Sequence, residues 1–296
     1  MSNLRILSFN VRMSWGEYGC AHNTWKDRKD LCLRVVREGG FDFIGLQETM
    51  WYPGTDPKGP PRGEIDQIED FRTGLPEYGL VGTARDADPA DGEGSPIFYR
   101  RDRWEPDAAE QGVFWLSETP DVRASRSWES RCTRICTWAL FHELSNGVRT
   151  GRRLVFSCVH LDHGYEHAQL RQAAVVAGFL RRHVDAGRDV VLVGDFNAYP
   201  ESWPYRYLCG ETLRVGDSEI RPPLSLRDAW REANPDEPEG RTFHGWGDDT
   251  HDERIDYILY DGPSLRVKAS TIDRRTYDGR FPSDHYPVSA DFSFLP

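Results

Sequence analysis

Two polar residues that follow a buried strand are the first candidates for chemistry in this sequence. Asp195 and Asn197 come after the apolar run at residues 190–193. Strands buried on both faces tolerate few polar residues, so this strand must end where the polar residues begin. Because strand side chains alternate, residues two positions apart point to the same side. The sequence therefore predicts a carboxylate and a carboxamide aimed at one point, which is a pair of oxygen ligands.

Other polar residues stand at the ends of further predicted strands. Asn10 follows one strand, Glu48 follows a second, and Asp284 and His285 precede a third. Each has an ordinary explanation in isolation, as a turn residue, a helix cap or a solvated strand end, but their joint occurrence favours one shared site. Oxygen ligands with histidine and without cysteine are typical of a hard divalent cation such as Mg²⁺, with Mn²⁺ as the alternative, and not of structural zinc.

Two histidines add proton chemistry to these oxygen ligands. Asp256 lies within an apolar strand, and it needs a partner because an unpaired buried charge costs several kcal/mol. We predict that it accepts a hydrogen bond from His285 and thereby raises the basicity of that ring. His160 ends another strand. A buried structural histidine is its common explanation, but its place on a strand equivalent to that of Asn10 favours the shared site.

The elements that must position these residues form two similar units. Each unit has the order strand, helix, strand; the elements are 4–11, 25–38 and 41–46 in the first, and 154–159, 166–184 and 190–195 in the second. Thr24 is suited to cap the first helix, and Gly39 and Gly40 end it. The strands of both units end in polar residues, so we expect two related halves whose strand ends meet.

Further strands fill the rest of the chain. The candidates, which are typical of antiparallel meanders, are 95–100, 110–117, 134–144, 254–260, 264–272 and 287–294. So many strands require two sheets, which favours a β-sandwich with helices packed outside each sheet. Residues 53–63 and 234–253 are predicted loops. No linker rich in Pro, Gly and Ser marks a boundary, so we expect one domain over residues 1–296.

The strand-end motifs, taken in order, resemble those of the endonuclease/exonuclease/phosphatase superfamily. The motifs are at residues 7–12, 45–48, 159–161, 194–197, 254–258 and 283–288. The resemblance spans residues 4–294 and is strongest to small bacterial members. It implies an α+β fold, namely a four-layer αββα sandwich of two mostly antiparallel sheets with helices outside. It also implies an enzyme that cleaves a phosphate ester with Mg²⁺.

The resemblance implies a metal site as well. Glu48 would hold the metal most directly, Asn10 would hold it too, and Asp284 would contribute through water. Two residues depart from the abasic-site branch of the superfamily, in which an acid stands at the position of Arg12 and a tyrosine at that of His160. Both departures favour the deoxyribonuclease, sphingomyelinase and deadenylase branches.

The same resemblance implies catalytic roles for five residues. Asp195 would orient or deprotonate the attacking water, and Asn197 would hold a phosphate oxygen. His285, paired with Asp256, would act as a base or as a transition-state stabiliser. His160 would donate a hydrogen bond to the phosphoryl group or protonate the leaving oxygen. This arrangement would stabilise the charge that develops on phosphorus-bound oxygens during in-line attack.

An arginine-rich segment at residues 122–134 offers candidate substrate contacts. Arg131 and Arg134, with the nearby Trp115 and with Arg12 of the first motif, could read phosphate and stack on a base or sugar. A solvated arginine face and a core tryptophan are the ordinary alternatives.

The composition of the chain limits the kinds of partner and compartment that we expect. A formal net charge of −11 argues against broad binding to long nucleic acid, although short nucleic acid stays open. The six cysteines lack a paired CxxC spacing, which favours buried thiols in a reducing compartment. No signal peptide or membrane span is visible, so we expect a cytoplasmic monomer.

Three hypotheses about function follow. The first is a metal-dependent phosphodiesterase or phosphatase acting on a small or short substrate. The second is a nuclease or 3′-exonuclease that binds single strands through the arginine segment. The third is a catalytically inactive carbohydrate- or protein-binding module on the same fold.

Overall fold

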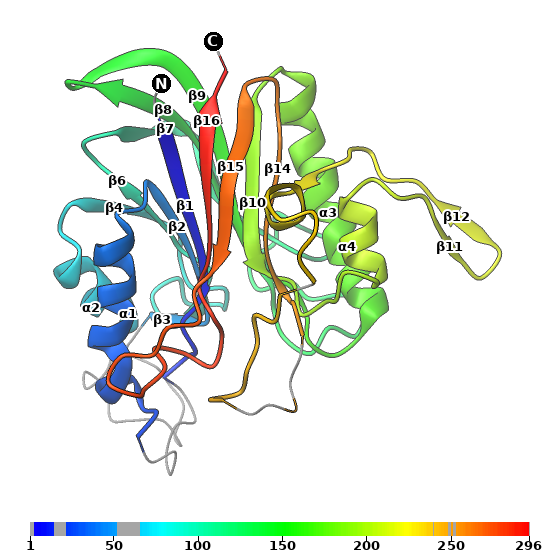
Figure 1. Ribbon diagram of the computed structural model, residues 1–296. Helices are drawn as coiled ribbons and strands as arrows, with labels where there is room; N and C mark the ends of the chain where they lie inside the picture. Colours follow the sequence, from blue (N-terminus) through cyan, green and yellow to red (C-terminus); the bar gives the residue numbers. More distant parts are fainter. Residues whose placement is uncertain are drawn as a thin grey trace.

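Two six-stranded sheets form the centre of the computed structural model, which describes residues 3–14, 22–51, 66–238, 240–247, 250 and 253–295 (Figure 1). The first sheet has the order β15 (Leu265–Ile272), β16 (Val288–Phe294), β1 (Asn3–Asn10), β2 (Phe43–Gln47), β6 (Ile97–Arg100) and β4 (Tyr78–Val81). The second has the order β13 (Arg227–Asp228), β14 (Asp256–Asp261), β10 (Asp189–Asp195), β9 (Val148–His160), β8 (Ile135–Ser145) and β7 (Trp104–Trp115).

Helices cover the outer faces of both sheets. Figure 1 shows α1 (Trp25–Gly39) and α2 (Gln67–Gly74) beside the first sheet, and α3 (Glu166–Asp185) and α4 (Trp203–Leu208) beside the second. The short helix α5 (Ala229–Ala233) contacts β14 and β15. Two small two-stranded sheets complete the described part. One pairs β3 (Thr49–Trp51) with β5 (Gly92–Gly94), and the other pairs β11 (Leu213–Val215) with β12 (Ser218–Ile220). The predicted sandwich with helices outside is therefore confirmed.

Three apolar clusters correspond to the three interfaces between these layers. One joins the first sheet to α1 and α2, and another joins the second sheet to α3. The third fills the space between the sheets, where Phe43 lies 5.0 Å from Phe156 and 4.8 Å from Phe141 between ring centroids. Gly45 marks a close approach, because a Cβ there would lie 2.3 Å from the side chain of Val193 in the other sheet.

Each sheet contains one parallel pair that follows from a strand–helix–strand unit. β1 pairs with β2 and β9 with β10, while the other strand pairs in the two large sheets are antiparallel. The helices α1 and α3 make the crossovers. The predicted cap Thr24 begins α1, where it forms a capping box with Asp27, and Gly40, whose φ is 59°, caps the other end. Parallel strands end at the same edge of a sheet, so both units deliver their terminal residues to one end of the sandwich.

The structure extends some predicted elements and adds others. β7 begins at Trp104 and β9 at Val148, earlier than predicted, because these strands run on in largely exposed arms whose residues lack an apolar alternation. The short elements α2, β4, β5, α4 and α5 were not predicted from the sequence. The predicted loop at 53–63 lies outside the described residues, and the described residues between 240 and 247 form a loop with isolated bridges, as predicted.

Two further expectations concern cysteines and membranes. The described cysteines are free, and Cys32, Cys136 and Cys158 are buried, as predicted for thiols in apolar segments; Cys20 lies outside the described residues. Among the residues that the structure describes, no helix combines the length and apolar character that crossing a membrane requires.

The aromatic contacts between the sheets should contribute strongly to the free energy of unfolding. Phe43→Ala should lower the free energy of unfolding by about 3–5 kcal/mol, because it removes a fully buried ring and leaves a cavity. Urea denaturation would measure the loss. Val148→Ala, at a side chain 68% exposed, is the control and should change the value by less than about 0.5 kcal/mol. A loss for Phe43→Ala as small as that of the control would contradict this assignment of the core.

Candidate active site

Four polar side chains continue the rows of residues by which the two sheets pack together. On β1, Ile6 faces the other sheet, and the alternation of strand side chains places Asn10 on the same side. The side chains of β9, β10 and β14 that face the other sheet follow the same alternation. At or near the end of each strand, the residue on that side is polar, namely His160, Asp195 and Asp256. All four side chains are buried, and so is Glu48, which follows β2.

Asn10 joins the two sheets at this point. Its Nδ2 donates to Glu48 Oε1 at 3.1 Å and to Asp195 Oδ2 at 2.9 Å, and its Oδ1 accepts from the backbone N–H of Arg12 at 2.9 Å. The amide nitrogen, and not the oxygen, therefore faces the two carboxylates. In this arrangement Asn10 orients Glu48 and Asp195, and its role as a metal ligand stays a prediction.

The chain turns sharply at three of these positions. Arg12, Glu48 and Asn197 have φ values of 57°, 55° and 48°, in the left-handed region that residues other than glycine rarely adopt. Each such residue costs about 1–3 kcal/mol and persists only where its surroundings fix it. At Asn197 the backbone N–H donates to Asp195 Oδ1 at 2.8 Å, so the turn aims both side chains that the sequence singled out at the same place.

His285 and Asp256 form the predicted pair. His285 Nδ1 lies 2.9 Å from Asp256 Oδ2, and its Nε2 lies 3.8 Å from Asp195 Oδ2. Burial by itself disfavours a charged ring. The charge and hydrogen bond of Asp256, with the charges of Asp195 and Asp284, outweigh that effect and raise the pKa of His285 to about 10. The ring is therefore an imidazolium at neutral pH when no cation is bound.

His160 contacts the same carboxylate from the other side. Its Nε2 lies 3.4 Å from Asp195 Oδ2 and 2.9 Å from Asn197 Nδ2. Its Nδ1 lies 3.4 Å from Glu93 Oε1. The sequence singled out His160 and Asn197 but missed Glu93, which lies in the two-glycine strand β5 where no apolar alternation signals a strand.

Glu93 is held by two arginines behind His160. It forms ion pairs with Arg85 and with Arg134, the latter at 3.4 Å. Burial would raise the pKa of Glu93, but the charges of Arg85 and Arg134 and the contact with His160 hold it well below its usual range. Glu93 is thus a buried anion that orients His160, and Arg134 belongs to this network.

The residues predicted to read substrate separate in the structure. Trp115 and Arg134 are 6% and 4% exposed, so they do not form the exposed lip that the sequence indicated. Trp115 Nε1 donates to the carbonyl of Arg85 at 2.7 Å. Arg131 lies at the surface with its guanidinium 5.1 Å from the ring of Tyr165, and Arg12 lies at the mouth of the site.

A second residue missed by the sequence fixes the arginine segment. Asp162, two positions after His160, accepts hydrogen bonds from the hydroxyl of Ser130 at 2.8 Å and from the backbone of Arg131 at 2.7 Å. Asp162 is fully buried. Since it follows a predicted strand end, its position was a signal that could have found it.

A divalent cation would fit among the carboxylates. Within the described residues, Glu48, Asp195 and His285 offer ligand atoms that all lie within 4.8 Å of one another. Burial raises the pKa values of Glu48 and Asp195, but nearby charges and hydrogen bonds, His160 foremost, hold both below their usual range, so both are anions. Two buried carboxylates so close together call for a cation, and carboxylate oxygens suit Mg²⁺ and Mn²⁺.

Arg28 of α1 fixes the two loops that frame this cluster. Its buried guanidinium donates to the carbonyls of Val11, of Arg12 at 2.7 Å and of Pro282 at 3.3 Å. Ser283 Oγ adds a hydrogen bond to the carbonyl of Asn10 at 2.7 Å. The segment carrying Asp284 and His285 is therefore tied to the end of β1, which explains how residues more than 270 positions apart share one site.

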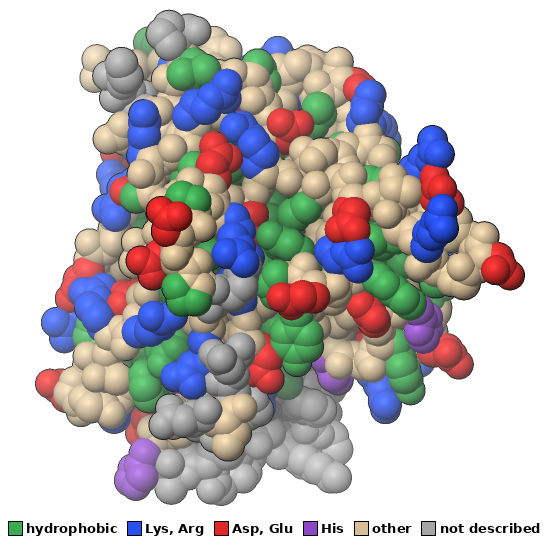
Figure 2. Space-filling model, turned by 45° about the vertical axis from the view of Figure 1, so that its right-hand side comes forward, with side chains coloured by type: hydrophobic (Ala, Val, Ile, Leu, Met, Phe, Trp, Pro, Cys, Tyr) green, Lys and Arg blue, Asp and Glu red, His purple; other side chains and the backbone are tan. Residues whose placement is uncertain are grey.

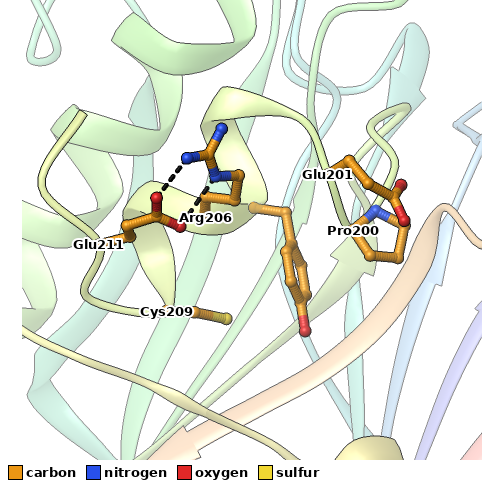
Figure 3. Close-up of a pocket in the computed structure, with 6 residues that line it drawn as sticks. Pro200, Glu201, Arg206, Cys209 and Glu211 are labelled. Carbon is orange, nitrogen blue, oxygen red and sulfur yellow. Dashed lines mark hydrogen bonds and ion pairs between the residues drawn. The ribbon is translucent and has the colours of Figure 1, made fainter. Parts of the chain in front are cut away.

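A separate hollow lies at α4 (Figure 3). It has a volume of about 540 Å³ and is lined by Pro200, Glu201, Tyr205, Arg206, Cys209 and Glu211. Arg206 and Glu211 pair with each other there, and burial raises the pKa of the Cys209 thiol to about 12. The hollow contains none of the motif residues, and its thiol is protonated at neutral pH, so it offers neither the predicted metal ligands nor a thiolate nucleophile.

Comparisons with known proteins agree with this geometry. A model of the Endonuclease/Exonuclease/phosphatase family matches residues 7–285. The solved structure of an endonuclease/exonuclease/phosphatase from Bacteroides vulgatus is 28% identical, with a TM-score of 0.81 and 100% of both chains covered. That of a mannosyl-6-phosphatase from Bacteroides thetaiotaomicron is 27% identical, with a TM-score of 0.77 and 98% and 100% of the two chains covered.

A curated relative is longer than this chain. The protein named Nocturnin from Drosophila melanogaster is 24% identical over 337 residues, which cover 99% of this chain and 47% of the relative. The chain thus spans about half the length of that protein.

The pairing of His285 with Asp256 predicts a pH dependence in the protein stripped of metal by EDTA. The imidazole of His285 should stay protonated to about pH 10, and Asp256→Asn should lower that pKa. A raised folded-state pKa stabilises the fold fully below the unfolded value of about 6.5 and loses that contribution as pH rises toward 10. NMR titration of the ring and urea denaturation between these pH values would test both points.

Asp107→Asn is the matched control for this titration. It removes a partly buried carboxylate on β7 that lies 3.1 Å from His142 on β8. This pair does not include a residue of the cluster, so the titration of His285 should not change. Titration of His285 near pH 6.5 in the unmodified protein would contradict the effect assigned to Asp256.

Proposed function

We propose that this chain, which belongs to the Endonuclease/Exonuclease/phosphatase family and is therefore a phosphoric ester hydrolase, cleaves a phosphate ester of a small or short substrate with Mg²⁺ or Mn²⁺. Members of this family generally depend on a divalent metal. The observation that carries the proposal is the buried group of Glu48, Asp195 and His285, held across the two sheets by Asn10. Such a group provides anionic ligands, a base and a cationic donor within a few ångströms.

Glu48 is the principal ligand for the cation in this proposal. Its carboxylate is oriented by Asn10 Nδ2 and by the backbone N–H of Met13, at 3.2 Å from Oε2. Asp284 lies on the same side, since Arg12 contacts both carboxylates, and it contributes through water. When bound, a divalent cation supplies Lewis-acid stabilisation of the charge on phosphoryl oxygens.

Asp195 handles the attacking water. It is an anion at neutral pH, and its Oδ2 lies within 3.8 Å of Asn10, His160 and His285. That oxygen can accept a hydrogen from water and orient the lone pair of the water toward phosphorus. In this scheme a protonated His285 acts as a transition-state stabiliser, whereas a neutral ring would be needed for the alternative role of base.

Asn197 and His160 bind the phosphoryl group. Asn197 Nδ2 and His160 Nε2 lie 2.9 Å apart, so both can reach one oxygen or two neighbouring ones. Glu93 lies behind the His160 ring and fixes its orientation. Donors fixed before the reaction stabilise developing charge without reorganisation, which is why they contribute strongly to rate.

The nature of the surface supports a small or short substrate. Figure 2 shows Lys and Arg side chains interspersed with Asp and Glu over one face, without an extended basic track on that face. The mannosyl-6-phosphatase, among the similar solved structures, acts on a sugar phosphate according to its name. The inactive binding-module hypothesis is disfavoured, because the structure brings together the ligand, base and donor groups that catalysis needs.

A nuclease acting on single strands is the second candidate. Arg131 stacks on Tyr165, and Tyr165 is 39% exposed five residues after His160. An exposed aromatic ring with an arginine is typical of surfaces on which bases stack. Binding of a short single-stranded oligonucleotide that weakens steeply with salt would favour this candidate.

Loss of the proposed groups predicts a large loss of rate. Asp195→Asn and His285→Ala should each lower kcat by about 10²–10³ or more, because each removes a group that stabilises the reaction. His285→Ala should also lower Tm, because it leaves Asp256 buried without this partner. Asp185→Asn, at an exposed ion pair with Arg181, is the control and should leave kcat unchanged. Retention of activity within about threefold in both site variants, a far smaller change than loss of such a group produces, would remove the site assignment.

A panel of esters would test the reaction itself. We expect hydrolysis of p-nitrophenyl phosphate, bis-p-nitrophenyl phosphate, a sugar phosphate or a short oligonucleotide when Mg²⁺ or Mn²⁺ is present, and its loss in EDTA. Product release measured by absorbance or chromatography decides the outcome. If every phosphate ester stayed intact with either metal, the proposed function would be refuted.

A further inference from the structure

Arg12 occupies a particular place at the mouth of the site. Its guanidinium lies between two carboxylates, with Nη1 3.5 Å from Glu48 Oε2 and Nε 3.7 Å from Asp284 Oδ2. The side chains of Glu48 and Asp284 are 10% and 7% exposed, whereas that of Arg12 is 41% exposed. Arg12 is thus the cation that stands between the buried carboxylates and the solvent from which a substrate arrives.

Neighbouring residues hold the backbone of Arg12 in the left-handed conformation, which residues other than glycine rarely adopt. Its φ is 57°. Its N–H donates to Asn10 Oδ1 at 2.9 Å, and its carbonyl accepts from Arg28 Nη2 at 2.7 Å and from Gln67 Nε2 at 3.0 Å. Arg28 and Gln67 are 1% and 0% exposed. Three hydrogen bonds from buried groups therefore aim an exposed side chain at the site.

The number of free phosphate oxygens decides what such a cation could recognise. A phosphodiester has two unesterified oxygens, and the proposed function supplies partners for both, namely the cation at Glu48 and the donors Asn197 and His160. A phosphomonoester has a third unesterified oxygen and a second negative charge. That oxygen needs a further donor, and a guanidinium matches phosphate in both shape and charge.

The negative charges of the site make a cationic donor such as Arg12 more important for a phosphomonoester than for a phosphodiester. Glu48, Asp195 and Asp284 are buried carboxylates at the proposed site, and in their ionised form they repel a dianion more strongly than a monoanion. Arg12 contacts two of the three. A cation bound at Glu48 would repel the guanidinium from that carboxylate, while a dianionic phosphoryl group would attract it.

We propose that Arg12 is the specificity-determining residue that binds the third unesterified oxygen of a phosphomonoester, so that this enzyme is a phosphomonoesterase in preference to a phosphodiesterase. The proposal rests on the proposed function and names its substrate class. Arg12 leaves the carboxylates of Glu48 and Asp284 for the phosphoryl group when cation and substrate are both present.

Two esters of the same leaving group test this proposal. p-Nitrophenyl phosphate and bis-p-nitrophenyl phosphate both release p-nitrophenol but differ in the number of free oxygens. Arg12→Gln should lower kcat/KM for the monoester roughly 10–100-fold more than for the diester, as expected for loss of one charged hydrogen bond. Arg12→Lys should keep part of the monoester rate. Arg34→Gln, at an exposed ion pair with Glu38 on α1, is the matched control and should change neither rate.

Metal affinity separates a role in specificity from a role in building the metal site. Calorimetric titration of Arg12→Gln with Mn²⁺ should show an affinity equal to or higher than that of the unmodified protein, since a cation beside Glu48 has been removed. Inorganic phosphate should also inhibit this variant less strongly.

The outcomes distinguish the two proposals. Equal losses on both esters, or weaker Mn²⁺ binding by Arg12→Gln, would overturn the role of Arg12 and leave the proposed function standing. Faster cleavage of the diester than of the monoester by the unmodified protein would do the same. Cleavage of neither ester, nor of any other phosphate ester, would defeat the proposed function and the inference with it.

Discussion

The carboxamide of Asn10 is the contact on which the site depends. It lies at the end of a strand in one sheet and donates to Glu48 of that half and to Asp195 of the other. A buried carboxylate is costly unless it is hydrogen-bonded and compensated by charge. One amide with two hydrogens satisfies an oxygen of each, so it permits two anions to approach across the interface between the sheets. Without the carboxamide of Asn10, the repulsion between these two carboxylates would oppose their close approach.

A second layer of buried charge supports the first. Glu93, with Arg85 and Arg134, stands behind His160, and Arg28 fixes the loops that carry Arg12 and Asp284. None of these residues needs to touch a substrate to matter, because each fixes a residue that the proposed mechanism uses. Groups held in place before the reaction are what stabilise developing charge effectively. The apolar clusters on both sides of the sheets supply the rigidity that this arrangement requires.

The fold and the substrate are decided by different parts of the molecule. The two solved structures compared above share the sandwich, yet one is named for its family and the other is named a mannosyl-6-phosphatase, at 28% and 27% identity. One fold carries many activities because specificity lies in the side chains around the reacting atoms. In this chain the proposed substrate contacts are Arg12 at the mouth and Arg131 with Tyr165 farther out, and each supports a different candidate substrate class.

The sequence by itself determined the paired strand–helix–strand units, the outward helices and the strand-end residues Asn10, His160 and Asp195, because apolar alternation and helix caps are local signals. The pairing of Asp256 with His285 also followed, since a charge inside an apolar strand needs a partner. Only the tertiary structure showed that Trp115 and Arg134 are buried and that Glu93 supports His160. Burial and ion pairing depend on neighbours distant in sequence, and no local pattern records which neighbours the folded chain supplies.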